Sequence, residues 1–116
     1  MNDTIETIIR ESLSGARLAD RFALQPAQID ALRRSGDLLA VRNRGEYYYP
    51  AWQFNGGGKA LPQVQALVRT ARANGMSDEA LCELLMRRVG MTHSRVIDLV
   101  RAGDTSLADR LVRRAA

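Results

Sequence analysis

Glutamine and arginine side chains are spaced along residues 17–44 in a way that could support binding to a nucleic acid. A glutamine amide can pair with an adenine edge, and an arginine fork fits a guanine edge or a phosphate. The candidate residues are seven of these side chains: Arg17, Gln25, Gln28, Arg33, Arg34, Arg42 and Arg44. The alternative interpretation of each arginine is a solvated surface charge.

Reactive side chains elsewhere do not form a catalytic set. His93 is the single histidine and lies in an expected loop, and Cys82 is the single cysteine, set among leucines at helical spacing. Neither an internal disulfide nor a Cys/His metal site is expected. The carboxylates of residues 78–83 have the positions of helix-start charges, and residues 56–59 lack the P-loop pattern. We expect no cofactor, no metal and no enzymatic activity.

Positive charge is concentrated after residue 32. The chain carries 17 basic and 13 acidic residues, a net charge of +4, and all basic residues except Lys59 are arginines. Residues 1–32 have a net charge of −2, whereas residues 33–59 and 60–116 each have +3. This distribution favours a polyanionic partner. The alternative explanation is a genome whose codon usage favours arginine.

The length of 116 residues fits one compact domain or two small subdomains. No apolar run approaches the roughly 20 residues of a membrane-spanning helix. The first residues, MNDTIETIIRESL, are acidic and amphipathic, whereas a secretory signal needs a positive start and a longer apolar stretch. We therefore expect a cytoplasmic protein without membrane association.

The elements that must position the seven side chains begin with short helices. Apolar residues recur at helical spacing over residues 3–13, which predicts a first amphipathic helix that Ser14-Gly15 ends. Residues 16–23 predict a second helix. Residues 26–35 predict a third, which opens with a proline and ends at a Ser-Gly pair. The second and third helices, joined by a short turn, have the pattern of a helix-turn-helix.

The period then changes to that of strands. Residues 38–41 (LLAV) and 47–54 (YYYPAWQF) are prone to form strands, and RNRGE between them predicts a hairpin turn. Strand alternation places the first and third tyrosines on one face and the second on the other. Pro50 marks an edge or a strand end because it cannot donate a backbone hydrogen bond. Trp52 and Phe54 are expected to pack the hairpin onto the helices.

From residue 61 the helical period returns. Four helices are predicted, with these limits: Pro62 to Asn74-Gly75, Ser77 to Gly90, Ser94 to Gly103, and residues 106–116. The three glycines at 56–58 predict a flexible joint. The predicted organisation is a DNA-binding domain at 1–55, a Gly-rich linker at 56–60 and a helical dimerisation or partner-binding domain at 61–116.

The predicted fold is mainly α: an N-terminal winged helix-turn-helix with a small β-hairpin, followed by a C-terminal bundle of about four short helices. In a winged helix the third helix enters the major groove and the hairpin contacts the backbone or the minor groove. Gln25, Gln28 and Arg33 would then contact bases or nearby phosphates. The backbone anchors would be Arg34, Arg42, Arg44 and Arg17. Stacking of the tyrosines on single-stranded bases is an alternative.

The order of three segments, YYYPAWQF, LPQVQALV and LVRAGD, resembles the small bacterial proteins related to the antitoxins of the Xre/MbcA/ParS type. The resemblance covers roughly residues 16–114, and PAWQF and RAGD are its most specific parts. The matching residues are Tyr49, Pro50, Ala51, Trp52, Gln53, Phe54, Leu61, Pro62, Asp98, Leu99, Arg101, Ala102, Gly103 and Asp104.

The resemblance implies an N-terminal DNA-binding domain and a C-terminal helical domain that dimerises and binds a toxin protein. It implies that Arg95, Arg101 and Asp104 contribute to the partner surface. The family has a Gly-Gly-Arg loop before its LLRAGD helix, whereas Thr92-His93 replaces the glycine pair here and the arginine lies one place later, at Arg95.

The sequence leads to the hypothesis of a sequence-specific double-stranded DNA-binding protein that acts as an autoregulating transcriptional repressor and forms a homodimer. The alternative is an antitoxin-like interaction protein that binds and neutralises a toxin through its C-terminal helices.

Overall fold

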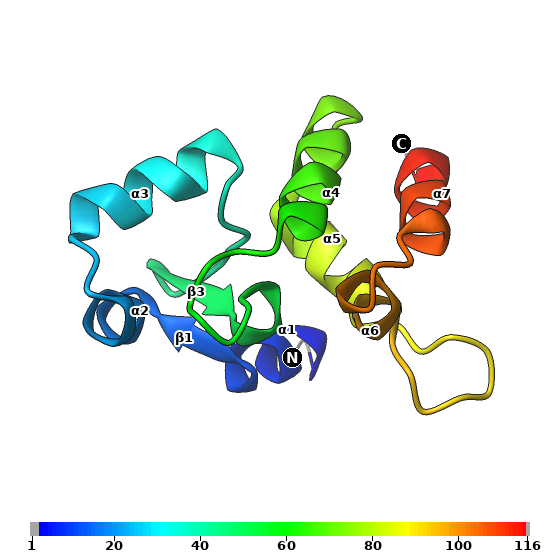
Figure 1. Cartoon of the computed structure of the whole chain (residues 1–116), viewed down its shortest axis with the longest axis horizontal. Coiled ribbons are helices and arrows are strands. Elements are labelled where there is room, and N and C mark those ends of the chain that lie inside the picture. The colour runs from blue at the N-terminus through cyan, green and yellow to red at the C-terminus, as the bar shows by residue number, and fades with distance from the viewer. Residues whose placement is uncertain (1–2, 116) are drawn as a thin grey trace. The chain divides into compact units, whose positions relative to one another are not determined.

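The structure is a computed structural model that describes residues 3–115. The chain divides into two compact units, the first ending at Ala60 and the second beginning at Leu61. Helices predominate, and one small antiparallel sheet lies in the first unit (Figure 1). The predicted mainly α class is confirmed at this level.

The first unit alternates short helices with short strands. Its elements are α1 Asp3–Arg10, β1 Ser12–Ser14, α2 Gly15–Phe22, α3 Pro26–Ser35, β2 Val41–Asn43, β3 Glu46–Pro50 and a 3-10 turn η1 Ala51–Gln53. The strand order is β1-β3-β2, with both pairings antiparallel. Strand β3 therefore lies in the centre, and Pro50 marks the end of this strand and not a sheet edge.

The prediction that the first helix continues to Leu13 is wrong. Helix α1 ends at Arg10, and the Ser12 hydroxyl donates to the carbonyl of Ile8 at 2.6 Å, which closes the last turn. Leu13 lies in β1 opposite Tyr49. A three-residue strand has too little periodicity to be separated from the helix that precedes it, so β1 was not predicted.

Helices α2 and α3 form where the sequence predicts them. Ser14 caps α2, its hydroxyl accepting from the Arg17 amide at 3.2 Å, and Ala23 ends the helix in the left-handed region. Pro26 opens α3, where it needs no donor. Gly36 closes α3 with φ of 88°, a backbone conformation that glycine adopts without strain.

The hairpin is confirmed, but its strands differ from those predicted over residues 38–41 and 47–54: the first lies later in the chain, and the second ends at Pro50, after which η1 begins. Strand β2 begins at Val41, after an irregular segment that includes Leu38 and Leu39. The turn consists of Arg44 and Gly45, both with positive φ, at 52° and 82°. Two central residues with positive φ match the right-handed twist of the strands that they join.

A small core holds the sheet to α2 and α3. Leu18, Ile29, Tyr49 and Phe54 are buried in it together, and the rings of Phe22 and Phe54 lie 5.1 Å apart. The expected packing of Phe54 onto the helices is thus confirmed.

Gln53 is the buried polar side chain of the described core, and sequence reasoning did not predict its role. Its Oε1 accepts from the Leu39 amide at 2.8 Å and its Nε2 donates to the Leu39 carbonyl at 2.7 Å. One side chain thus satisfies both backbone groups of a buried residue that no strand pairs.

The triple glycine forms a closed loop instead of an open joint. The Asn55 side chain accepts from the amides of Gly57 and Lys59, and the Asn55 amide donates to the Lys59 carbonyl at 2.8 Å. Gly58 has φ of 80°, and a Cβ there would collide with the ring of Phe22. This loop belongs to the first unit.

The second unit is helical: α4 Pro62–Ala73, α5 Asp78–Leu85, α6 Val96–Arg101 and α7 Ser106–Ala115. Ser77 caps α5, as predicted. The predicted end of α5 at Gly90 is wrong, because α5 stops at Leu85 and the chain then forms a hairpin-like loop. Arg95 and not Ser94 precedes α6, and its amide donates to Asp98 at 2.7 Å. Within residues 3–115, the helices are too short or too polar to cross a membrane.

Candidate nucleic-acid interface

Six of the seven side chains proposed for nucleic-acid binding are exposed on the first unit. Gln25 and Gln28 lie at the start of α3. The side-chain oxygen of Gln28, Oε1, accepts from the backbone amide of Gln25 at 2.7 Å, and the side-chain NH2 group of Gln28 takes no part in this bond. The exposed arginines lie in the first turn of α2, late in α3, on β2 and in the hairpin turn: Arg17, Arg34, Arg42 and Arg44.

Arg33 differs from the other six because it is packed against the sheet. Its side chain is 16% exposed, and its guanidinium carbon lies 3.8 Å from the centroid of the Tyr47 ring. Its Nη2 donates to Asp30 on the same helix at 3.3 Å. Arg33 therefore links α3 to β3. This position favours a role in orienting α3 and disfavours a direct contact with a base.

The electrostatics of Arg33 agree with this packing. Burial alone would lower the pKa of its guanidinium, but hydrogen bonds to Asp30 and Tyr49 outweigh burial and raise that pKa. Burial likewise raises the pKa of the Tyr49 phenol, and Arg33 opposes that shift in part. Both groups thus keep their ordinary protonation states at neutral pH, the arginine charged and the phenol neutral.

Tyr47 is the point where the helix and the hairpin meet. It pairs in register with Arg42 of β2, and the guanidinium carbon of Arg42 lies 5.7 Å from its ring centroid. Arg33 of α3 contacts the same ring. One aromatic ring thus fixes the position of the hairpin relative to α3, which a sequence pattern alone could not indicate.

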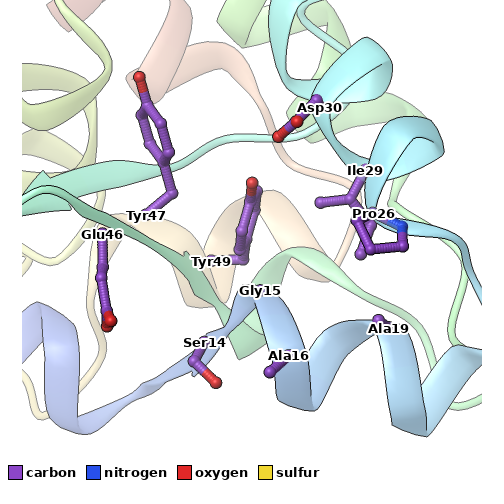
Figure 2. Close-up of a pocket in the computed structure, with 10 residues that line it drawn as sticks. All are labelled: Ser14, Gly15, Ala16, Ala19, Pro26, Ile29, Asp30, Glu46, Tyr47 and Tyr49. Atoms are coloured by element: carbon purple, nitrogen blue, oxygen red, sulfur yellow. The ribbon is translucent and has the colours of Figure 1, made fainter.

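A hollow of about 540 Å³ lies between α2, α3 and β3. Figure 2 shows Asp30 and Ile29 entering it from α3, Tyr47 and Tyr49 from β3, and small side chains from α2. Tyr47 and Tyr49 share this side of the strand, as predicted from alternation.

The hollow is not suited to a phosphate. Its charged lining consists of the carboxylates of Asp30 and Glu46, and Glu46 also accepts from the Tyr48 hydroxyl at 3.2 Å. Asp30 in this hollow also accepts from Arg33. Sequence reasoning did not single out this role, because only the fold places Asp30 beside the tyrosines.

The three residues implied for partner binding lie at the two ends of α6 and in the turn that follows it. Asp104 accepts from the Ser106 amide and hydroxyl at 3.3 and 2.9 Å, and its own amide donates to the Leu99 carbonyl. Gly103 has φ of 96° between α6 and α7. Arg95 precedes α6, and Arg101 is exposed in its last turn. RAGD thus forms the turn that joins two helices.

The single cysteine and histidine occupy the environments predicted for them. Cys82 is buried, and burial raises the pKa of its thiol. His93 is exposed in the loop before α6. The described residues include no group of three or more His, Cys, Asp or Glu side chains that could hold a metal ion.

Comparison with known proteins gives a likeness in fold. No family model and no curated protein matches the chain. The chain is similar to the NMR structure of Rv2175c, with a TM-score of 0.76 and 19% sequence identity, over 90% of this chain and 80% of that chain. At this identity the likeness extends to the fold alone.

Proposed function

We propose that the chain is a sequence-specific double-stranded DNA-binding protein whose first unit is a winged helix-turn-helix, and that it represses its own promoter. The observation that carries the proposal is the arrangement of exposed Gln and Arg side chains on α2, α3 and the adjacent β2-β3 hairpin. Helix, turn, helix and hairpin follow one another in the order that winged DNA-binding domains use.

The roles follow from position. Helix α3 enters the major groove, where Gln25 and Gln28 at its first turn meet base edges. Arg34 on α3 and Arg17 at the start of α2 contact phosphates, and the hairpin turn brings Arg44 to the backbone of the adjacent groove.

Arg33 acts as a positioning residue in this proposal. Its stack on Tyr47 keeps α3 and the hairpin at a fixed spacing, so both can contact one duplex. Helices of the second unit would join two copies in a homodimer, whose symmetry suits a palindromic site.

The test exploits the hydrogen bond between Gln28 and the Gln25 amide. The Gln28→Glu variant keeps an oxygen that can accept from that amide but removes the donor that an adenine requires. The ratio of affinities for promoter DNA and scrambled DNA should fall about tenfold, since a bidentate base contact contributes about 1–3 kcal/mol of discrimination. Using the ratio cancels the uniform loss that the added charge causes.

Gln65→Glu on α4 is the matched control, with the same charge change in the second unit. It should leave the ratio unchanged. An unchanged ratio in Gln28→Glu would remove the start of α3 from base recognition.

A second candidate function is an antitoxin-like interaction through the C-terminal helices. Helix α7 favours it, because a hollow of about 440 Å³ on this helix is lined by half-buried leucines and by arginines. The lining residues are Leu107, Arg110, Leu111, Arg113 and Arg114. An apolar surface edged by cations suits an acidic protein partner.

Co-expression with the product of a neighbouring small gene tests this candidate. The wild-type chain should co-purify with that product, and Leu107→Asp with Leu111→Asp should not. If the wild-type chain does not retain the product, the antitoxin-like function is excluded for that gene pair.

A further inference from the structure

The loop between α5 and α6 is a hairpin held by its own backbone. The Val89 amide donates to the Ser94 carbonyl and the Val96 amide to the Arg87 carbonyl, both at 2.9 Å. Arg88 and Arg95 form an antiparallel bridge between these bonds. Figure 1 shows the loop extending away from the helices that it connects.

The tip of this hairpin is also ordered locally. The Thr92 hydroxyl donates to the Val89 carbonyl at 2.7 Å and accepts from the Ser94 amide at 3.2 Å. Gly90 begins the turn with φ of 57°. Between them, Met91 is 103% exposed and is the exposed large apolar side chain of the described residues. The fold presents this methionine to solvent without using it in packing.

Arginines lie on both arms of the hairpin that presents this methionine. Arg87 and Arg88 are exposed on one arm, His93 is exposed at the tip, and Arg95 lies on the other arm. No acidic residue occurs between Glu83 and Asp98 in the sequence. The hairpin therefore has a net charge of +3 and one apolar tip.

We propose that this hairpin is a second DNA-contacting arm, with Arg87 and Arg88 on backbone phosphates and Met91 in the minor groove. Architectural DNA-binding proteins combine cations with an apolar wedge, methionine among them, that partly unstacks a base step and bends the duplex. The inference rests on the proposed function, because it assigns a further contact to the same DNA-bound protein.

Charge and apolar area together favour DNA over other anionic surfaces. Stable attachment to a membrane needs a large apolar face, and a single methionine side chain supplies little apolar area. The charge of the hairpin matches a polyanion such as DNA.

The first variant is Arg87→Ala with Arg88→Ala. Each lost phosphate contact reduces the slope of log affinity against log salt by about 0.9, so the slope should fall by about 1.8. Between 50 and 200 mM salt, the variant should lose about twelvefold less affinity than the wild type. Arg10→Ala with Arg21→Ala is the matched control, because it removes the same charge from exposed positions that neither proposed surface uses.

The second variant is Met91→Ser. It should keep the salt slope and should reduce the bend of a duplex labelled at both ends for fluorescence energy transfer. A wild-type complex that leaves the duplex straight, or a bend that Met91→Ser retains, overturns the role of Met91.

The outcomes separate this inference from the proposed function. If the wild type binds promoter DNA and the Arg87/Arg88 variant has an unchanged slope, the arm is refuted and the first unit remains the DNA-binding surface. If the wild type binds no DNA, both proposals fail. Binding of the hairpin to vesicles of phosphatidylserine and phosphatidylcholine, lost in the same variant and without DNA binding, would assign it to a membrane instead.

Discussion

Replacing Arg33 with alanine should destabilise the first unit, because this side chain joins α3 to β3. A stacked and largely buried guanidinium contributes about 1–2 kcal/mol through its cation–π contact. The hydrogen bond to Tyr49 adds about 1 kcal/mol, and the ion pair with the half-exposed Asp30 adds about 0.5 kcal/mol or less. The expected loss in the free energy of unfolding is therefore about 2–3.5 kcal/mol.

Tryptophan fluorescence during urea unfolding measures this loss, since the single tryptophan, Trp52, lies in the first unit. Arg34→Ala is the control, because Arg34 is exposed on the same helix and its loss should change stability by about 0.5 kcal/mol or less. Arg33→Lys keeps the charge but loses the planar stack and the fork, so most of the destabilisation should remain.

One result would contradict this structural role of Arg33. Arg33→Ala could unfold at the same urea concentration as the wild type and lose DNA affinity as steeply as Arg44→Ala does. That result would mean that Arg33 is free in solution and contacts DNA directly, as the sequence alone suggested.

Three further changes probe the framework around the site. Gln53→Leu should lower the free energy of unfolding by about 2–4 kcal/mol in urea titrations, because it leaves the buried amide and carbonyl of Leu39 unpaired. An unchanged free energy would show that these backbone groups find another partner. Gly58→Ala should lower the free energy of unfolding by about 2 kcal/mol or more in the same assay, since the new Cβ would collide with Phe22 and residue 58 has a positive φ. An unchanged free energy would mean that the loop is mobile. Cys82 should react with Ellman's reagent only after unfolding, because burial holds the pKa of its thiol high, and rapid reaction of the native protein would contradict the helical packing around it.

Longer periodic segments of the fold could be predicted from the sequence, and elements defined by tertiary pairing could not. Helices α2, α3 and α4 have clear caps or proline starts, and their predicted positions hold within a residue or two. Strand β1 exists only because Leu13 pairs with Tyr49. No local signal in three residues reveals a partner 36 positions away.

The two most specific motifs have structural explanations that spacing does not reveal. In PAWQF, Pro50 ends the central strand, Gln53 satisfies the backbone of Leu39, and Phe54 packs on Phe22. In RAGD, the last residue, Asp104, caps the turn into α7. Each motif holds its own unit together, so its presence indicates a fold more directly than a binding partner.

The exposure of most candidate side chains could be predicted, since helix periodicity and the hairpin turn place six of the seven at the surface. The exception is Arg33, because it packs against Tyr47 of β3. Strand β2 separates α3 from β3 in the sequence, so the pattern of α3 alone does not reveal this contact. Asp30 was missed for the same reason: its exposure to a hollow is a property of the fold and not of the helix alone.

The most direct test of the central claim is fluorescence anisotropy of the purified chain against DNA from its own promoter region and against scrambled DNA, at 50 and 200 mM salt. The proposal predicts tighter binding to the promoter at both concentrations, with a preference that persists as the total affinity falls. Equal binding to both duplexes that disappears at the higher salt would contradict sequence-specific recognition and would leave only a basic surface.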